Sequence, residues 1–469
     1  MRGWALTALG ASVALAAAPA QVQAQSGCIG QTSAQGVPQK PGLPLRFGIT
    51  PGVQTGQLGT GPQPPRTPED PAQQVAALHR LAPPGVPLVL RLHRFFWSDG
   101  EAGVAHFLNL ASLYTREGFP VELQLRYHPT KQQEGDIAAW TGFVREVVDR
   151  FGPNPRVVGI QVTNEVNLAD SPDSSDGAYN GGIDALIQGV IAAKDEARRR
   201  SFDQLAIGFN WAYRAPPSED QSFWNSIRDK GGRRLVASLD WIGLDAYPGT
   251  FFPPADTPGG ERDAMVNAMS SLRCFAEGAG IPDRIPIYVE ENGWPTGPGR
   301  SDDRQAQAMD AMVRAVSDFR GTYNVSDYRW FDLRDSDSTS PNFQQQYGIL
   351  RDDYSAKPAF GRYHSLIDEL SIRPAVAPPA VAKRRAVLRV SCRRHRRWRL
   401  SARVPGARRI QFLLDGRVVA RDGRRPFRRS LRLRRGRHRI GARALPGGLT
   451  LTVVVRGCSA GATTRTVRG

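Results

Sequence analysis

Short apolar runs alternate with amphipathic stretches from about residue 43 to residue 370. Runs of this length are typical of buried strands in a parallel sheet, and the stretches between them repeat apolar residues with a helical period. Strands are predicted at 45–50, 87–92, 121–127, 157–163, 205–209, 241–246, 285–290 and 328–333. Eight strand–helix units in one domain predict a (β/α)₈ barrel, the TIM-barrel architecture.

The helix signals between these runs agree with this topology. The clearest helices are predicted at 138–150 and 184–199. The second opens on Asp184, a residue type suited to an N-cap, and ends in a basic turn suited to a helix C-terminus. An open doubly wound sheet is the alternative, but the residues at 48–52 (GITPG) lack the glycine-rich phosphate-binding pattern that it requires after its first strand.

A change in pattern after residue 370 predicts a second domain. The sequence PAVAPPAVA at 374–382 is typical of an extended linker, which we place at 371–383. Seven short strands follow, at 387–390, 398–404, 409–414, 418–421, 430–433, 438–444 and 450–455, and Asp415-Gly416 is a hairpin signal. They predict a small all-β sandwich over 384–460. The stretch 410–444 also resembles bacterial immunoglobulin-like modules appended to secreted enzymes.

Charge divides the chain at the same place. From Lys383 onward there are 27 lysines and arginines against two acidic residues, a net +25. Because the whole chain of 469 residues carries +18, the rest carries −7. The arginine-rich part could bind an anionic cell-wall polymer, an acidic polysaccharide or a membrane surface. It carries no nucleic-acid recognition motif. The alternative is that these arginines are simply solvated and reflect the base composition of the coding DNA.

The first 24 residues predict export. Met1-Arg2 precedes an apolar run at 4–18, and the small residues at 22–24 suit signal-peptidase cleavage. That run is shorter than the roughly 20 residues of a membrane-spanning helix, and no later stretch is apolar enough to span a bilayer. We therefore expect a secreted protein, cell-wall associated if the basic domain binds there. A lipid anchor on Cys28 is a weaker alternative, because QSG at 25–27 lacks the expected apolar residue.

Four cysteines suit an oxidising compartment. Cys392 and Cys458 bracket the basic domain and are predicted to pair. Spacing alone leaves a Cys28–Cys274 pair open. No cysteine lies in a CxxC or Cys/His cluster, so we expect no zinc site.

Two glutamates lie where barrel enzymes place catalytic groups. Glu165 follows the fourth strand in VVGIQVTNEVN, and Glu291 follows the seventh in IPIYVEENGWPTG. Catalytic residues of such barrels stand at the C-terminal ends of strands, and glycoside hydrolysis requires two carboxyl groups. Glu290 competes with Glu291, but strand alternation predicts that these neighbours point to opposite faces.

These motifs resemble the large clan of retaining (β/α)₈ glycosidases that place Asn-Glu on strand 4 and Glu on strand 7. The ENGWP at 291–295 is similar to ESGWP of β-1,3-glucanases and to ENG of β-glucosidases; cellulases belong to the same clan. The resemblance implies Glu165 as acid/base, Glu291 as nucleophile and Asn164 as a ligand of the sugar 2-hydroxyl.

The resemblance extends to four further residues. Tyr247, in WIGLDAYPG, is similar to the tyrosine that hydrogen-bonds the nucleophile, and Trp330, in YRWFDLRD, to the sugar platform. Arg91, in LVLRLHRFFW, resembles the arginine that keeps the nucleophile ionised, and His128, in LQLRYHP, an active-site histidine. Core packing is the alternative for Tyr247 and Trp330, and structural hydrogen bonding for Arg91 and His128.

Together these features predict a secreted retaining glycoside hydrolase that cleaves β-linked glycans, such as β-glucan, by double displacement, without a metal or organic cofactor. Two alternatives remain open. One is a non-catalytic carbohydrate-binding protein of the cell wall, and the other is a transglycosylase that uses the same residues.

Overall fold

The computed structural model describes residues 28, 34–52, 56–57, 61–62, 65–169, 172–253, 260–371, 386–393, 397–404, 407–424, 426–433, 436–445, 450–456 and 464–468. The predicted signal peptide, the PAVAPPAVA segment and Cys458 lie outside these residues. The chain divides into two compact units between Arg373 and Pro374.

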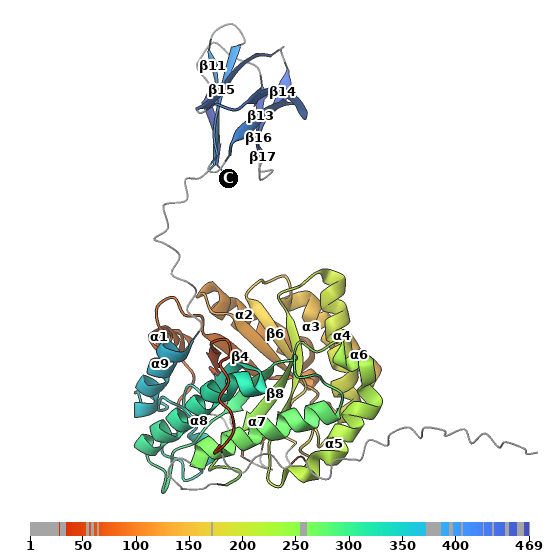
Figure 1. Ribbon diagram of the computed structural model, residues 1–469, viewed down its shortest axis with the longest axis vertical. Coiled ribbons are helices and arrows are strands. Elements are labelled where there is room, and N and C mark those ends of the chain that lie inside the picture. Colours follow the sequence, from red (N-terminus) through yellow and green to blue (C-terminus); the bar gives the residue numbers. More distant parts are fainter. Residues whose placement is uncertain are drawn as a thin grey trace, which may run out of the picture. The chain divides into compact units, whose positions relative to one another are not determined.

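The first unit is a closed barrel of eight parallel strands surrounded by helices, as predicted (Figure 1). The strands, in their order around the barrel, are β1 (Arg46–Ile49), β4 (Val89–Phe96), β5 (Val121–Arg126), β6 (Val157–Val162), β7 (Ala206–Ala212), β8 (Trp241–Ala246), β9 (Ile287–Asn292) and β10 (Val325–Trp330). β10 pairs with β1 and closes the ring. A short pair, β2 (Gly56–Gln57) and β3 (Gly61–Pro62), follows β1.

The outer layer consists of helices whose apolar faces pack on the strands. They are α1 (Pro71–Leu81), α2 (Gly100–Arg116), α3 (Ile137–Phe151), α4 (Gly182–Arg200), α5 (Gln221–Ser226), α6 (Gly232–Val236), α7 (Gly260–Gly278), α8 (Asp302–Tyr323) and α9 (Pro358–Leu370), with short turns η1 (Trp97–Asp99), η2 (Pro217–Asp220), η3 (Ile227–Gly231) and η4 (Phe343–Gln345). None of the helices in the described ranges is long and apolar enough to cross a lipid bilayer.

Side-chain caps set several helix starts, but the cap predicted for α4 is wrong. Asp70, Asp136 and Ser301 accept backbone N–H groups at the starts of α1, α3 and α8. α4 instead begins at Gly182, after Gly181 in the left-handed conformation, and Asp184 lies within its first turn. Asp184 still suits that place, because a carboxylate near a helix N-terminus interacts favourably with the helix dipole.

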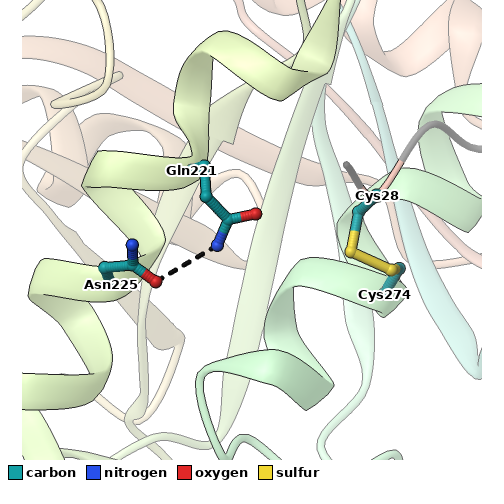
Figure 2. The surroundings of a disulfide bond; sticks show 4 residues. All are labelled: Cys28, Gln221, Asn225 and Cys274. Carbon is teal, nitrogen blue, oxygen red and sulfur yellow. Dashed lines mark hydrogen bonds between the residues drawn. A yellow bond between two sulfur atoms is a disulfide. The ribbon is translucent and has the colours of Figure 1, made fainter. Parts of the chain in front are cut away.

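A disulfide joins Cys28 to Cys274 on α7, which settles the pairing that the sequence left open (Figure 2). The two Cα atoms are 5.7 Å apart and 246 positions apart in the sequence. A bridge over so long a loop stabilises the fold by about 5 kcal/mol in the chain-entropy description. Because the Cys28 sulfur takes part in this bond, the disulfide disfavours the lipid anchor on Cys28.

The second unit contains two four-stranded antiparallel sheets around a shared apolar core. One sheet has the order β15-β12-β11-β18 and the other β14-β13-β16-β17. The strands are β11 (Val387–Arg393), β12 (Arg397–Arg403), β13 (Arg409–Leu414), β14 (Arg417–Asp422), β15 (Phe427–Arg432), β16 (Arg437–Leu445), β17 (Thr450–Arg456) and β18 (Thr464–Arg468).

Seven of these strands follow the predicted pattern, and β18 was not predicted. The unit is a small all-β domain, as expected, and its likeness to immunoglobulin modules stays a prediction. Cys392 is disulfide-bonded; its predicted partner, Cys458, lies outside the described residues.

Candidate active site

Three carboxylates meet at the C-terminal ends of the barrel strands. Glu165 follows β6, Asp245 lies in β8 and Glu291 lies in β9. One oxygen from each lies within 4.8 Å of one oxygen from each of the others. Glu165 has a left-handed backbone conformation, with φ of 47°. A non-glycine residue adopts this region rarely, and such residues concentrate at functional sites.

Glu291 is held by the two residues predicted to contact it. Nη1 of Arg91 lies 2.8 Å from its Oε1, and the Tyr247 hydroxyl donates a hydrogen bond of 2.6 Å to its Oε2. Arg91 is fully buried, so its charge is poorly screened by water. Burial lowers the pKa of Arg91, but the charge of Glu291 and other nearby carboxylates outweighs this and raises it. Both carboxylate oxygens of Glu291 are therefore held by hydrogen-bond donors.

Glu165 has the opposite environment. Its backbone N–H donates to Oδ1 of Asn210 at 2.9 Å, but its carboxylate accepts no hydrogen bond from any residue within the described ranges. Burial, followed by the charge of Glu291, raises the pKa of Glu165 to about 8. The raised pKa suits Glu165 to the role of a proton donor.

Asn164 lies at the centre of an amide network beside the glutamates. Its Oδ1 accepts hydrogen bonds from Gln124 at 2.7 Å, Asn210 at 2.7 Å and Gln161 at 3.0 Å. Its Nδ2 donates one hydrogen to the carbonyl of Ser174 at 2.7 Å. An amide nitrogen carries two hydrogens, so one stays available to a ligand.

The structure favours the alternative given for Trp330, which was core packing. The Trp330 side chain is fully buried, with its ring centroid 6.2 Å from that of Tyr363 on α9, so it offers no face to a ligand. Its neighbour Phe331 instead forms an aromatic cluster with Tyr247 and Tyr347, at centroid distances of 6.3 and 5.6 Å. Of the two successive aromatic residues in YRWFD, Trp330 therefore packs in the core and Phe331 lies with Tyr247.

The contacts that the structure describes for His128 include neither Glu165 nor Glu291. Its Nδ1 is 3.1 Å from the Ser98 hydroxyl, and its ring packs against Phe96 at 4.5 Å and Tyr179 at 5.2 Å. Burial, followed by the charge of Arg126, lowers the pKa of His128. The structure places this residue at the rim of the strand ends.

Regular strand alternation does not hold at Glu290 and Glu291, so the prediction that these neighbours point to opposite faces is wrong. Leu244 and Asp245 are consecutive in β8, yet they pair with Val289 and Glu291, so β9 has one extra residue at Glu290. Such a bulge breaks the alternation of side chains. As a result both carboxylates contact Arg91: Oε2 of Glu290 lies 3.2 Å from its Nε.

Glu290 nevertheless belongs to the interior of the barrel. It is fully buried, and burial, followed by the charge of Glu122, raises its pKa well above the ordinary value. Glu122 in turn lies 3.1 Å from Nη2 of Arg329. This arrangement suits a neutral Glu290 that shares its proton with Glu122 and leaves the charge of Arg91 to Glu291.

Three residues of the site were missed: Gln124, Asn210 and Asp245. Nε2 of Gln124 is 3.5 Å from Oε1 of Glu291, and Asn210 donates a hydrogen bond to Asp245. Burial, followed by the charges of Glu291 and Glu165, raises the pKa of Asp245 well above its ordinary value. Each lies within an apolar strand run, and a polar residue in such a run was the available signal.

A cavity of about 290 Å³ lies between the end of β4 and the helices α1 and α2, and neither Glu165 nor Glu291 lines it. Its lining includes Glu69, His93, Arg94, Asp99 and His106. The His93 ring also contacts Phe331, at a centroid distance of 5.6 Å, which connects the cavity to the aromatic cluster.

Glu165, Asp245 and Glu291 are close enough together to share a cation. Two observations disfavour this reading. Both oxygens of Glu291 already accept from Arg91 and Tyr247, and the buried guanidinium would repel a metal ion.

No family model matches the chain. A probable glucan endo-1,3-beta-glucosidase of Aspergillus niger is 23% identical over 216 residues, which are 44% of this chain and 41% of that protein. The chain thus spans about two fifths of the length of this curated relative.

Among solved structures, a family 39 glycoside hydrolase from Bacteroides cellulosilyticus WH2 aligns with a TM-score of 0.49 and 15% identity, over 91% of this chain and 81% of that one. A beta-glucosidase from Thermotoga maritima aligns with a TM-score of 0.47 and 12% identity, over 64% and 86%.

Proposed function

We propose that the barrel is a retaining glycoside hydrolase with Glu291 as nucleophile and Glu165 as acid/base. The observation that carries this proposal is the separation of the two carboxylates, whose nearer oxygens lie within 4.8 Å. Retaining enzymes hold their carboxyl groups about 5–5.5 Å apart, whereas inverting enzymes need about 6.5–9.5 Å to admit a water molecule. The spacing here therefore favours direct attack by one carboxylate.

The environments of the two groups support these roles. Glu291, held by Arg91 and Tyr247, attacks the anomeric carbon, while the protonated Glu165 donates its proton to the leaving oxygen. Attack converts the Glu291 carboxylate into a neutral ester. The negative charge that helped to raise the pKa of Glu165 then disappears, so this pKa falls. After it has given up its proton, Glu165 therefore stays ionised and can accept a proton from the water that cleaves the ester.

The neighbouring groups suit a sugar. Asn164 has one amide hydrogen for a ring hydroxyl, and Phe331 with Tyr247 and Tyr347 forms an apolar wall for the C–H face of a pyranose. This assigns the platform to Phe331 in place of Trp330. His128 would contact only a substrate long enough to extend from the two glutamates to the rim of the strand ends.

The substrate that we propose is a β-linked glucan. The ENGWP motif at 291–295 and the name of the Aspergillus niger relative, a probable glucan endo-1,3-beta-glucosidase, both support it. The N-terminal export pattern and the disulfides support secretion. The basic second unit supports attachment to an anionic cell-wall polymer.

The test is hydrolysis of aryl β-glycosides and of β-1,3-, β-1,4- and mixed-linkage glucans by the full chain, with the first-formed anomer followed by NMR. Retention with a glucan substrate is expected. An inverted product would disprove the double displacement, and transfer to added sugar acceptors in place of water would identify a transglycosylase. Binding of glucans without turnover would leave the non-catalytic alternative.

A further inference from the structure

The outer face of the sheet β15-β12-β11 carries a dense set of arginines. We define the arginine face by its exposed members: Arg389 on β11; Arg397, Arg399 and Arg403 on β12; Arg428 and Arg432 on β15. The buried residues between them, such as Trp398 and Leu400, point into the apolar core. Side chains at alternate positions share one side of a strand, so these arginines project together to solvent.

The strand register brings the arginines into adjacent rows. Arg397 lies directly opposite Arg432, Arg399 opposite Ser430, and Ser401 opposite both Arg428 and Arg389. Neighbouring strands are about 4.8 Å apart and alternate residues of one strand about 6.6 Å apart. The six positive charges therefore share a compact area, interleaved with hydroxyl groups.

The described part of the second unit does not neutralise this charge. None of the six arginines forms an ion pair with any residue that the structure describes. The two acidic residues that follow Lys383 lie on the other sheet or its turn. Asp415 binds His438 and the backbone N–H of Arg439, and Asp422 accepts the backbone N–H groups of Arg424 and Arg428.

The repulsion between these arginines lowers the stability of the domain when no partner is bound. Like charges directly opposite on neighbouring strands destabilise a sheet, and the fold itself needs only polar residues at these exposed positions. A partner of opposite charge removes the repulsion. Arginine suits carboxylate, sulfate and phosphate groups because its planar fork binds two oxygens at once.

The residues between the arginines narrow the class of partner. They are Ser391, Ser401 and Ser430, whose hydroxyl groups suit the hydroxyls of a sugar chain. Among the described outward residues of these three strands, Val387 is the apolar one, and it is only half-exposed. Insertion into a membrane needs exposed apolar side chains, and sequence-independent binding of single-stranded nucleic acid needs aromatic platforms.

We propose that the arginine face binds an acidic polysaccharide, a linear sugar chain with carboxylate or sulfate groups. The arginines bind the anionic groups and the serines bind the ring hydroxyls. This surface belongs to the second unit, and the proposal does not depend on the chemistry of the barrel.

The test compares three forms of the full-length protein for binding to immobilised polygalacturonate at low and at high salt. The face variant is R397Q/R399Q/R428Q/R432Q. The matched control, R409Q/R437Q/R439Q/R443Q, removes four charges from exposed positions of the other sheet. Glutamine keeps much of the side-chain stem. The milder pair R399Q/R428Q serves if the fourfold face variant unfolds earlier on heating than the wild type.

The face variant should bind about tenfold more weakly or worse, the control within about twofold of wild type, and all binding should weaken with salt. Equal losses in both fourfold variants would show that net charge alone is responsible and overturn the proposal. Tighter binding of the wild type to duplex DNA or to phosphatidylglycerol vesicles than to polygalacturonate would overturn the class of partner. Hydrolysis of a small aryl glycoside should be the same in all forms, which separates a failure of binding from a failure of the proposed activity.

Discussion

The Tyr247 hydroxyl lies 2.6 Å from Oε2 of Glu291 and donates a hydrogen bond to it. Tyr247 follows β8 and Glu291 lies within β9, so two neighbouring strands fix the position of the carboxylate. The bond holds the carboxylate by the oxygen that Arg91 does not bind. It therefore leaves little rotational freedom to the group that we assign as nucleophile.

Replacement of Tyr247 by phenylalanine tests this relationship. Tyr247→Phe should lower kcat/KM on an aryl β-glycoside by roughly 10- to 100-fold, because a hydrogen bond to a charged group contributes about 1.5–3 kcal/mol. Tyr363→Phe is the matched control, since that buried hydroxyl also donates one bond of 2.6 Å, but to the carbonyl of Gly48 behind the site. If both variants lose activity equally, Tyr247 has only a structural role.

The neighbours Glu290 and Glu291 should respond differently to substitution. Glu291→Ala should abolish turnover, and added azide should restore product as a glycosyl azide of inverted configuration, because the anion enters the space of the lost carboxylate. Glu290→Gln should keep activity within about tenfold, since an amide resembles the neutral carboxyl group that we infer there. Kinetics and NMR of the azide product measure both. Loss of turnover in Glu290→Gln together with near-native rates in Glu291→Ala would exchange the two assignments.

Phe331 and Trp330 offer a second pair of adjacent residues with separable roles. Phe331→Ala should raise KM for a glucan oligosaccharide and also destabilise the fold, because its ring is buried in the aromatic cluster beside Glu291. Trp330→Ala should lower the free energy of unfolding by about 3–5 kcal/mol, as expected for loss of a fully buried large side chain, but leave KM unchanged in the protein that remains folded. Urea unfolding and initial rates distinguish the two effects. A stable Trp330→Ala enzyme with a raised KM would restore tryptophan as the platform.

The sequence predicted the barrel because each β-α unit repeats one local pattern, and errors of two or three residues at strand ends do not change the topology. β9 runs from Ile287 to Asn292, two residues later than expected. The site was harder to predict because its geometry depends on departures from regularity. The extra residue at Glu290 depends on pairing with β8, and no local signal in YVEEN reveals it.

Long-range contacts account for the other misses. Whether Trp330 or Phe331 faces the site depends on α9, whose Tyr363 covers the tryptophan. Gln124 and Asn210 become site residues only because closure of the barrel brings β5 and β7 to Asn164. The Cys28–Cys274 pair likewise required the fold, since spacing leaves connectivity open. The arginine content was visible in the sequence, whereas its gathering on one sheet face depends on the register of β11, β12 and β15.

The pH dependence of the reaction follows from the environment of Glu165. Burial and the charge of Glu291 raise its pKa to about 8, and the first step requires its protonated form. For a substrate with a poor leaving group, kcat/KM should therefore stay level up to about pH 8 and fall about tenfold per pH unit above it. The dinitrophenolate group of a dinitrophenyl glycoside leaves without a proton. The kcat/KM for such a substrate should therefore not fall above pH 8.

Glu165→Gln provides the matched variant for that measurement. It should remove the basic limb and slow the substrate with the poor leaving group far more than the dinitrophenyl glycoside.

The same substitution, Glu165→Gln, should change the stability of the fold with a sign that depends on pH. Because the folded-state pKa is raised, Glu165 stabilises the fold most below the pKa of the unfolded chain, near 4.5, and this contribution is lost as the pH rises to about 8. At pH 9 the buried carboxylate destabilises the wild type, so Glu165→Gln should unfold at higher urea concentration than wild type at pH 9 and gain much less at pH 5. An unchanged difference between these pH values would show that Glu165 is not the group with the raised pKa.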